Sequence, residues 1–502
     1  MRKKIARLLF SNRTLGQTVV KNIFWLSISL VFSRLIRLAV ILYAARVLDV
    51  AGYGIFSFAL AVAGFASIFA ELGVSSLFVR EVAKDPSLRS KYISTTFSLK
   101  LGLMVMVALV IALAGPLITP IPEAKGLITL IALFFLFDGL RDFGFSLIRG
   151  LEKMEVEAGL SLLTNLVFGV VVLGLLLNHP TPYYLTIGYV VGSAFGLLAT
   201  IWALRGQLSK IRLEYSWGWI KKIAAEAWPL ALYGFFLVLL SYWNTLMLGW
   251  LSTPHELGLY AAAQKPVQFL EVLPAIFAGS MLPALSRLVD HDANKFRSIM
   301  GQSLAITMGI ALPLVVGGIL MGDRVITLMY GQNYSLAGPI FVVLIIAVVS
   351  SFPFAIIQSA ILAGNLQKQL LRPIALGTII NLTLNFWLIP HLGALGAGLT
   401  TMVVQVVVYS LLYYQIQQRF GFQLLSHLKK IIPATIIMGL VIIGLQRLGV
   451  SFGISFLVAI AVYLGVLIVA KETLFEKLKN ILAEKEPSPA AELAGPITEL
   501  VE

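Results

Sequence analysis

Stretches of apolar residues long enough to cross a lipid bilayer recur along nearly the whole of this 502-residue chain. A helix needs about 20 such residues to span the hydrocarbon core of a membrane. Hydrophobic residues make up 59% of the sequence and charged residues only 12%. Because a bilayer offers the backbone no water, each stretch must satisfy its own hydrogen bonds as a helix. The sequence therefore predicts an all-α polytopic membrane protein.

The apolar pattern predicts about fourteen transmembrane helices. Several are longer than a straight crossing needs, which indicates tilted helices. The predicted spans are 21–46, 53–79, 92–115, 124–149, 155–177, 183–204, 223–250, 257–286, 297–321, 336–363, 369–390, 394–418, 429–446 and 451–470.

Basic residues are distributed unevenly between the predicted connections. With the N-terminus inside, 29 of the 38 lysines and arginines fall in regions that face the cytoplasm and four in regions that face outward. Cytoplasmic loops of membrane proteins carry this excess. We therefore predict a multi-pass protein of the cell (inner or plasma) membrane with both termini cytoplasmic. The net charge of +14 sits at helix ends and does not indicate a nucleic-acid partner.

The two halves of the chain resemble each other weakly. Residues 46–56 and 250–260 each follow a span, and each places a glycine and an aromatic residue at the start of the next span. Asn165 in the fifth span has a counterpart in Asn381 of the eleventh. An offset of six spans gives parallel repeats, and transporters built from repeats hold substrate between them near the midplane. The predicted fold is two six-helix lobes related by this repeat, plus two C-terminal helices.

Short polar segments divide the chain further. The basic N-terminus is expected to lie in the membrane interface as an uncleaved amphipathic helix. The end of the chain has the composition of a disordered segment. The predicted divisions are a basic interfacial segment (1–20), an N-lobe (21–204), a basic cytoplasmic linker (205–222), a C-lobe (223–420), two extra spans (421–470) and a cytoplasmic tail (471–502).

Five basic side chains lie within the predicted spans, where each costs roughly 2.5–3.5 kcal/mol at the membrane centre. A chain that keeps such charges is expected to hold water and an anionic partner in its interior, and so to move something negatively charged. Lys100 and Lys265 lie about eight residues from a predicted membrane edge and could instead snorkel towards it. The five are Arg34, Arg37, Lys100, Arg141 and Lys265.

Arg34 and Arg37 are three residues apart on the first span, so they share one helix face. A pair of guanidinium groups suits a phosphate, which accepts bidentate hydrogen bonds. The alternative is a salt bridge to an acidic residue on a neighbouring helix. Glu71, a single acid in the apolar second span, could be that counter-ion, a proton or cation site, or a protonated packing residue.

Asp138, Arg141 and Asp142 also share one face, on the fourth span. Their spacing allows Arg141 to be neutralised by its own helix neighbours. Alternatively, the three line a cavity, with a carboxylate that tunes or releases the arginine. The two interpretations are compatible.

The eighth span carries a polar stripe formed by Gln264, Gln268 and Glu271, with Lys265 beside it. Two prolines interrupt the same helix. A bent helix with a polar stripe suits a moving cavity wall, because neighbours and water can satisfy the freed carbonyl groups. A static packing kink is the alternative.

In the eleventh span, Asn381 and Asn385 lie four residues apart on one face. They are expected either to hydrogen-bond a neighbouring helix or to contact substrate. Signals of catalysis are lacking, since the sequence has no phosphate-binding loop, its five histidines are isolated, and it has no cysteine. We therefore expect a protein that is not an enzyme and uses no metal or cofactor, with coupling to H⁺ or Na⁺ left open.

Three segments resemble a known family. They are residues 44–58 (AARVLDVAGYGIFSF), 328–339 (LMYGQNYSLAGP) and 381–401 (NLTLNFWLIPHLGALGAGLTT). Together they resemble the polysaccharide-transport branch of the multidrug/oligosaccharidyl-lipid/polysaccharide exporter superfamily, which includes O-antigen-type lipid-linked oligosaccharide flippases. The resemblance covers about residues 15–420. It implies two six-helix lobes around a central cavity.

The resemblance also implies a function, which is to flip a polyprenyl-pyrophosphate-linked oligosaccharide to the outer leaflet by alternating access, for surface polysaccharide assembly. The expected partners are membrane lipids, this glycan and polysaccharide assembly enzymes. The alternatives are a multidrug/cation antiporter of the same superfamily and a lipid II-type flippase. The residues assigned to the pyrophosphate or cavity are Arg34, Arg37, Arg141 and Lys265, and those assigned to counter-ion or coupling roles are Glu71, Asp138, Asp142 and Glu271.

Overall fold

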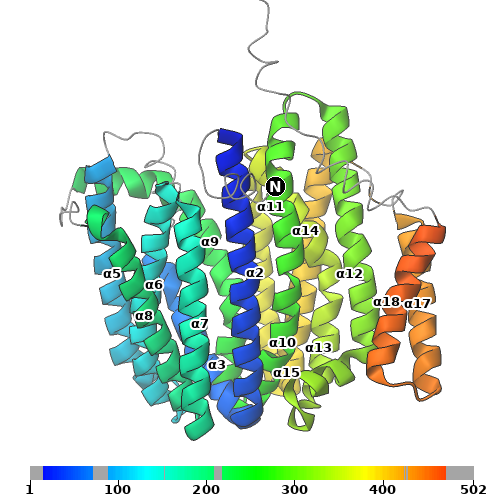
Figure 1. Ribbon diagram of the computed structural model, residues 1–502, viewed down its shortest axis with the longest axis horizontal. Helices are drawn as coiled ribbons and strands as arrows, with labels where there is room; N and C mark the ends of the chain where they lie inside the picture. Colours follow the sequence, from blue (N-terminus) through cyan, green and yellow to red (C-terminus); the bar gives the residue numbers. More distant parts are fainter. Residues whose placement is uncertain are drawn as a thin grey trace, which may run out of the picture. The chain divides into compact units, whose positions relative to one another are not determined.

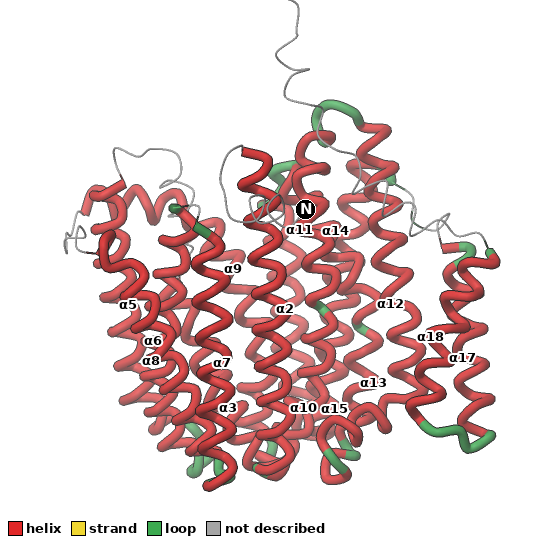
Figure 2. Tube along the Cα trace, in the orientation of Figure 1, coloured by secondary structure: helices red, strands yellow, loops and turns green. Residues whose placement is uncertain are grey.

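The computed structural model describes residues 15–71, 89–151, 153–208, 217–422, 424 and 428–470. Within these ranges the chain is α-helical apart from short connections and one 3₁₀ turn, and Figure 2 shows no strand in the described part. The predicted all-α polytopic fold is therefore confirmed. The predicted cytoplasmic tail and most of the predicted interfacial segment lie outside the described residues.

Each of the fourteen predicted spans overlaps described helices, and residues 72–79 of the second span lie outside the described residues. Each corresponds to one helix, to a consecutive pair of helices, or to one half of α15, in which the backbone breaks at Gly393 (φ 54°) between two predicted spans. The helices are α2 (Leu15–Val47), α3 (Asp49–Glu71), α5 (Arg89–Ile118), α6 (Ala124–Gly150), α7 (Met154–Asn178), α8 (Pro182–Leu208), α9 (Trp217–Leu251), α10 (Pro254–Leu270), α11 (Val272–Leu288), α12 (Ala293–Tyr330), η1 (Gln332–Tyr334), α13 (Ala337–Ile346), α14 (Val348–Ala363), α15 (Lys368–Phe420), α17 (Ile431–Arg447) and α18 (Phe452–Val469).

Ten of the described helices are long and apolar enough to cross a membrane, or eleven if α13 and α14, which meet at 40°, form one span. α6 is not among the ten, because Asp138, Arg141 and Asp142 lie along its middle. It packs against α3, α5 and α8. Neighbouring helices thus cover a helix whose charges would be costly against lipid.

The chain forms two compact units, which are described separately. The first comprises Met1–Ile276, Met321–Ser351 and Leu366–Leu412. In this unit α7 packs between α2 and α8 (Figure 1). In the second unit α17 packs against α18, and the Tyr463 hydroxyl donates to the Gly309 carbonyl oxygen at 2.6 Å. The predicted lobe boundaries concern an internal repeat and stay a prediction.

In the first unit, α3 and α10 meet in backbone contact near their N-terminal ends. A β-carbon on Gly54 would lie 2.0 Å from the Pro254 carbonyl oxygen, and one on Gly258 would lie 1.9 Å from the Val50 carbonyl oxygen. The contact is reciprocal, because the two glycines and the two carbonyl residues are each 204 positions apart, which matches the offset of the predicted repeat. Small residues are required wherever two helix backbones approach this closely.

The turn between α2 and α3 is held by the end of α12 and by η1. Arg46 Nε donates to the Met329 carbonyl oxygen at 2.8 Å. The Tyr334 hydroxyl lies 2.8 Å from the Ala45 carbonyl oxygen and 3.0 Å from that of Asp49, which has a positive φ of 63°. Burial raises the pKa of the Tyr334 phenol, so the hydroxyl stays a donor. Two segments that carried the family resemblance therefore touch each other.

Gly258→Ala is expected to destabilise the protein, because the added β-carbon would meet a backbone oxygen that no side-chain rotation can move. Overpacking of this kind costs about 1–3 kcal/mol. Thermal unfolding of the purified protein should therefore show a lower Tm. Gly102→Ala in α5 is the matched control, since a β-carbon there has nothing within 4 Å. Equal Tm values for the two variants would contradict the reciprocal contact.

Candidate functional site

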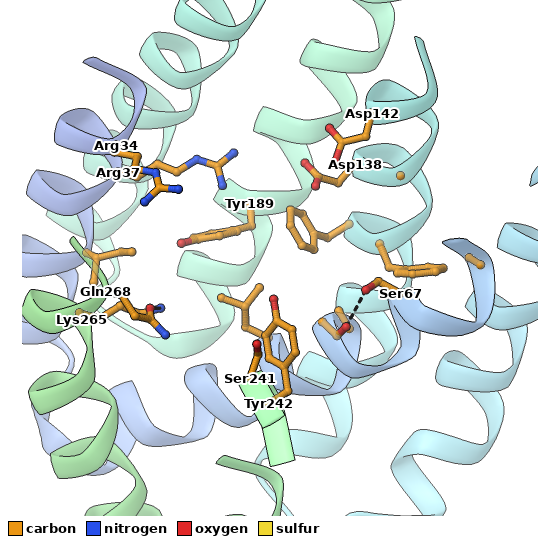
Figure 3. Close-up of a pocket in the computed structure, with 18 of the residues that line it drawn as sticks. Arg34, Arg37, Ser67, Asp138, Asp142, Tyr189, Ser241, Tyr242, Lys265 and Gln268 are labelled. Atoms are coloured by element: carbon orange, nitrogen blue, oxygen red, sulfur yellow. Dashed lines mark hydrogen bonds between the residues drawn. The ribbon is translucent and has the colours of Figure 1, made fainter. Parts of the chain in front are cut away.

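A cavity of about 910 Å³ lies within the first unit, between α2, α3, α5, α6, α8, α9 and α10. Figure 3 shows polar side chains that point into it from these helices. Its charged and polar lining residues are Arg34, Arg37, Ser67, Lys100, Asp138, Asp142, Tyr189, Ser241, Tyr242, Lys265, Gln268 and Glu271. The volume lies at the upper end of the range of about 300–1,000 Å³ that is usual for small-molecule pockets.

Arg34 and Arg37 both line this cavity from consecutive turns of α2, as their spacing predicted (Figure 3). Arg37 Nε donates to Asn165 Oδ1 on α7 at 2.6 Å, and Asn165 Nδ2 donates to the Ser161 carbonyl oxygen at 2.7 Å. Among the described side chains, no carboxylate lies within 4 Å of either arginine. A neutral amide therefore orients Arg37 and leaves its charge available.

A glycine stripe on α8 lets α7, the helix that carries Asn165, pack closely against it. β-Carbons on Gly188, Gly192 and Gly196 would lie 2.5, 3.0 and 2.6 Å from side-chain atoms of α7. Glycines four residues apart lie on one helix face and let neighbouring helices approach closely. α7 is thus pressed against α8 on one side and packs against α2 on the other.

Lys265 also lines the cavity, from α10, and its Nζ donates to Gln268 Oε1 at 3.2 Å. In Figure 3 these two side chains lie on the same side of the cavity as the two arginines. Glu271, at the end of α10, lines the cavity as well and interacts electrostatically with Arg34. Of the polar stripe predicted on this span, Gln268 and Glu271 therefore line the cavity with Lys265 beside them, while Gln264 lines a smaller adjoining cavity of about 50 Å³.

Arg141 is not one of the lining residues. It is buried in α6, where its guanidinium lies 2.8 Å from Asp138 and 2.8 Å from Asp142 and packs over the Phe145 ring. Both aspartates line the cavity, and the Asp142 side chain is 59% exposed. Arg141 is thus neutralised by its own helix, as one sequence interpretation had it. The carboxylates are at the same time exposed to the cavity, as the other had it.

Lys100 lines the cavity from α5, with its side chain 5.6 Å from the Phe143 ring centroid and the whole residue only 2% exposed. Snorkelling towards a membrane surface, one of the sequence expectations, is therefore wrong for Lys100, because the helix turns this residue inward. Because Arg141 lies behind the wall, four basic side chains and three carboxylates line the cavity among the described residues. The Glu71 side chain lies outside the described part of the chain.

Asn381 and Asn385 lie away from the cavity in a buried amide cluster. Their Nδ2 groups donate to Asn244 Oδ1 on α9, at 2.9 Å and 2.5 Å. Asn244 Nδ2 in turn donates to Thr401 Oγ1 at 2.6 Å. These bonds join three segments of the first unit, which matches the interhelical interpretation of the asparagine pair.

Sequence reasoning missed the roles of Tyr189, which lines the cavity, and of Asn165, which accepts a hydrogen bond from Arg37. Asn165 attracted notice only as a repeat counterpart, and Tyr189 is one of several hydroxyl-bearing residues on α8. Polar residues in mid-span were the available signal. Their partners could not be inferred, because Arg37 and Asn165 are 128 residues apart in the sequence.

The sequence matches the family described as polysaccharide biosynthesis protein over residues 19–289, more than half of the chain. The chain belongs to this family. It is 24% identical over 381 residues to a Haloferax volcanii protein named as the probable flippase AglR, covering 72% of this chain and 76% of AglR. A Shigella flexneri protein named as an O-antigen transporter is 20% identical over 331 residues, covering 64% of this chain and 78% of that protein.

The fold is similar to that of a solved structure of the lipid II flippase MurJ in an inward closed conformation. The TM-score is 0.72 at 18% identity, and the similarity covers 89% of this chain and 99% of MurJ. Likeness at this identity concerns the fold alone. The predicted family and fold class are confirmed, and the chain is a multi-pass membrane protein of a transporter family, not an enzyme.

Asn165→Leu is expected to reduce polysaccharide export about 10-fold in cells that depend on this protein, because Arg37 loses the acceptor that orients it. A hydrogen bond to a charged group contributes about 1.5–3 kcal/mol. Export is measured by surface-glycan staining at matched protein levels. Asn178→Leu, an exposed position on the same helix, is the control. Normal export by Asn165→Leu would show that Arg37 does not depend on this bond.

Proposed function

We propose that this protein is a flippase that moves a polyprenyl-pyrophosphate-linked oligosaccharide from the cytoplasmic to the outer leaflet for surface polysaccharide assembly. One observation carries the proposal. Arg34 and Arg37 line a cavity of about 910 Å³ and have no described carboxylate within 4 Å. Paired guanidinium groups offer the fork of donors that a diphosphate accepts. The names of the two relatives support the same transport class.

In the proposed mechanism, the cavity captures the headgroup, with Arg34, Arg37 and Lys265 on the pyrophosphate. The polyprenyl tail stays in the lipid. Rocking of the lobes by alternating access then exposes the glycan on the other side. Arg141 was expected to bind the pyrophosphate, but its proposed role is different. It is bound to Asp138 and Asp142 and holds these carboxylates at the cavity wall.

Coupling to H⁺ or Na⁺ would use the carboxylates at the cavity. Asp138, Asp142 and Glu271 line it, so each can exchange protons or ions with the cavity water. Glu71 stays a candidate from the sequence. Polysaccharide assembly enzymes stay the proposed protein partners.

The multidrug/cation antiporter is the less favoured alternative. A cationic substrate would meet four basic side chains against three carboxylates among the described residues that line the cavity. Like charges in a low-dielectric site repel strongly. A lipid II-type flippase shares the diphosphate chemistry and would differ only in the glycan.

Arg34→Ala combined with Arg37→Ala is expected to abolish export, because the diphosphate loses both forks of donors. Arg34→Lys with Arg37→Lys keeps both charges and should restore export in part, since lysine binds phosphate as a point charge. Surface-glycan staining at matched protein levels measures the effect. Arg324→Ala, an exposed arginine of α12, is the control. Normal export by the double alanine variant would remove the pyrophosphate role.

The proposed orientation can be tested because the chain has no native cysteine. A single cysteine at Glu123, exposed before α6, should react with a membrane-impermeant maleimide in intact cells, since the proposed topology places it outside. A cysteine at Asp290, exposed between α11 and α12, should react only after the cells are opened. The reverse pattern would invert the proposed topology.

A further inference from the structure

Tyr189 is the most constrained polar side chain in the cavity wall. Three rings surround its own, those of Phe168, Phe56 and Phe134, with centroids 4.7, 5.0 and 5.5 Å away. They come from α7, α3 and α6, while Tyr189 comes from α8. The Phe168 and Phe134 rings meet it edge to face, an arrangement that aromatic pairs prefer. The phenol therefore has one position, fixed by four helices.

The Tyr189 hydroxyl has no hydrogen-bond partner among the described residues, although the residue is only 6% exposed and lines the cavity. Figure 3 shows the hydroxyl pointing into the cavity, in the space between Arg37 and the Lys265–Gln268 pair. A phenylalanine would pack equally well against the three rings. The Tyr189 hydroxyl is therefore a donor at the cavity wall that a ligand acceptor can engage.

The charge around this hydroxyl indicates what kind of acceptor it meets. Tyr189 interacts electrostatically with both Arg37 and Asp138. Asp138 is already bound to Arg141 at 2.8 Å, whereas Arg37 has no described carboxylate partner. An anion drawn to Arg37 and Lys265 would come within reach of the phenol, and a neutral phenol can donate its proton to an anionic oxygen.

We propose that Tyr189 is a substrate-binding residue that donates a hydrogen bond to a non-bridging oxygen of the pyrophosphate held by Arg34 and Arg37. This deepens the proposed function, on which it rests, by adding a neutral donor of fixed position to the two cations. The cations bind any phosphate. The phenol adds a third contact, and we expect a diphosphate to reach it more readily than a monophosphate because its oxygens extend over a longer group.

The test measures binding of undecaprenyl pyrophosphate and undecaprenyl phosphate to the full-length protein in lipid nanodiscs. Tyr189→Phe removes only the hydroxyl and keeps the ring in its pocket. It is expected to weaken pyrophosphate binding about 10-fold, as for other hydrogen bonds to charged groups, and to leave the monophosphate unchanged. Tyr183→Phe, an exposed tyrosine at the start of the same helix, should change neither affinity.

Inorganic pyrophosphate is titrated in parallel, to separate recognition of the diphosphate from recognition of the lipid. The proposal requires that Tyr189→Phe weakens both. If Tyr189→Phe lost affinity for undecaprenyl pyrophosphate but not for inorganic pyrophosphate, the assignment of the hydroxyl to the diphosphate would be overturned. Wild-type affinity in Tyr189→Phe, or a lower Tm with unchanged affinity, would overturn the proposal by making the hydroxyl dispensable or structural.

The same experiment separates this inference from the proposed function. If Arg34→Ala with Arg37→Ala abolishes pyrophosphate binding while Tyr189→Phe binds normally, only the role of Tyr189 fails. If the wild-type protein binds neither pyrophosphate probe, or if the double arginine variant binds them as tightly as the wild type, the proposed function itself fails.

Discussion

The backbone contact between α3 and α10 is the constraint on which the candidate site depends. Gly54 and Gly258 each leave room for a carbonyl oxygen of the other helix, at positions where any side chain would collide. Because α10 is held there, Lys265 and Gln268 face the same cavity as the arginines of α2. Without this close contact between α3 and α10, the charges of the first six helices would line a cavity whose wall is incomplete. The contact is thus a condition for having one polar cavity rather than two exposed faces.

Neutral residues control how the cations of this cavity are used. Asn165 orients Arg37 without cancelling its charge, and the helix that carries Asn165 packs closely against the glycine stripe of α8. Arg141 shows the opposite arrangement, since two aspartates hold it and remove it from the wall. The two arginines therefore differ in whether their charge is neutralised. The difference lies in whether the partner is an amide or a carboxylate, because only the carboxylate neutralises the charge.

Much of the fold was predictable, because apolar runs and glycine or proline breaks follow directly from the cost of exposing backbone to lipid. Residues close in sequence were also predictable, such as Asp138, Arg141 and Asp142, since helix periodicity sets their common face. Contacts between distant helices were not. Periodicity indicates which face Asn165 or Tyr189 occupies but not which helix that face meets. The inward position of Lys100 was missed for the same reason, because its distance from the predicted membrane edge suits a snorkelling lysine as well as one that lines a cavity.

The charged middle of α6 also bears on how the protein is made. A helix with Asp138, Arg141 and Asp142 at its centre is poorly suited to leave the translocon alone, since each charge costs about 2.5–3.5 kcal/mol there. The salt bridges within α6 lower that cost as soon as the helix has formed. The apolar helices α5, before α6 in the sequence, and α8, after it, pack against α6 and lower the remaining cost. Stable insertion of α6 therefore depends on helices on both sides of it in the sequence, so the first lobe must assemble during biogenesis as a group rather than one helix at a time.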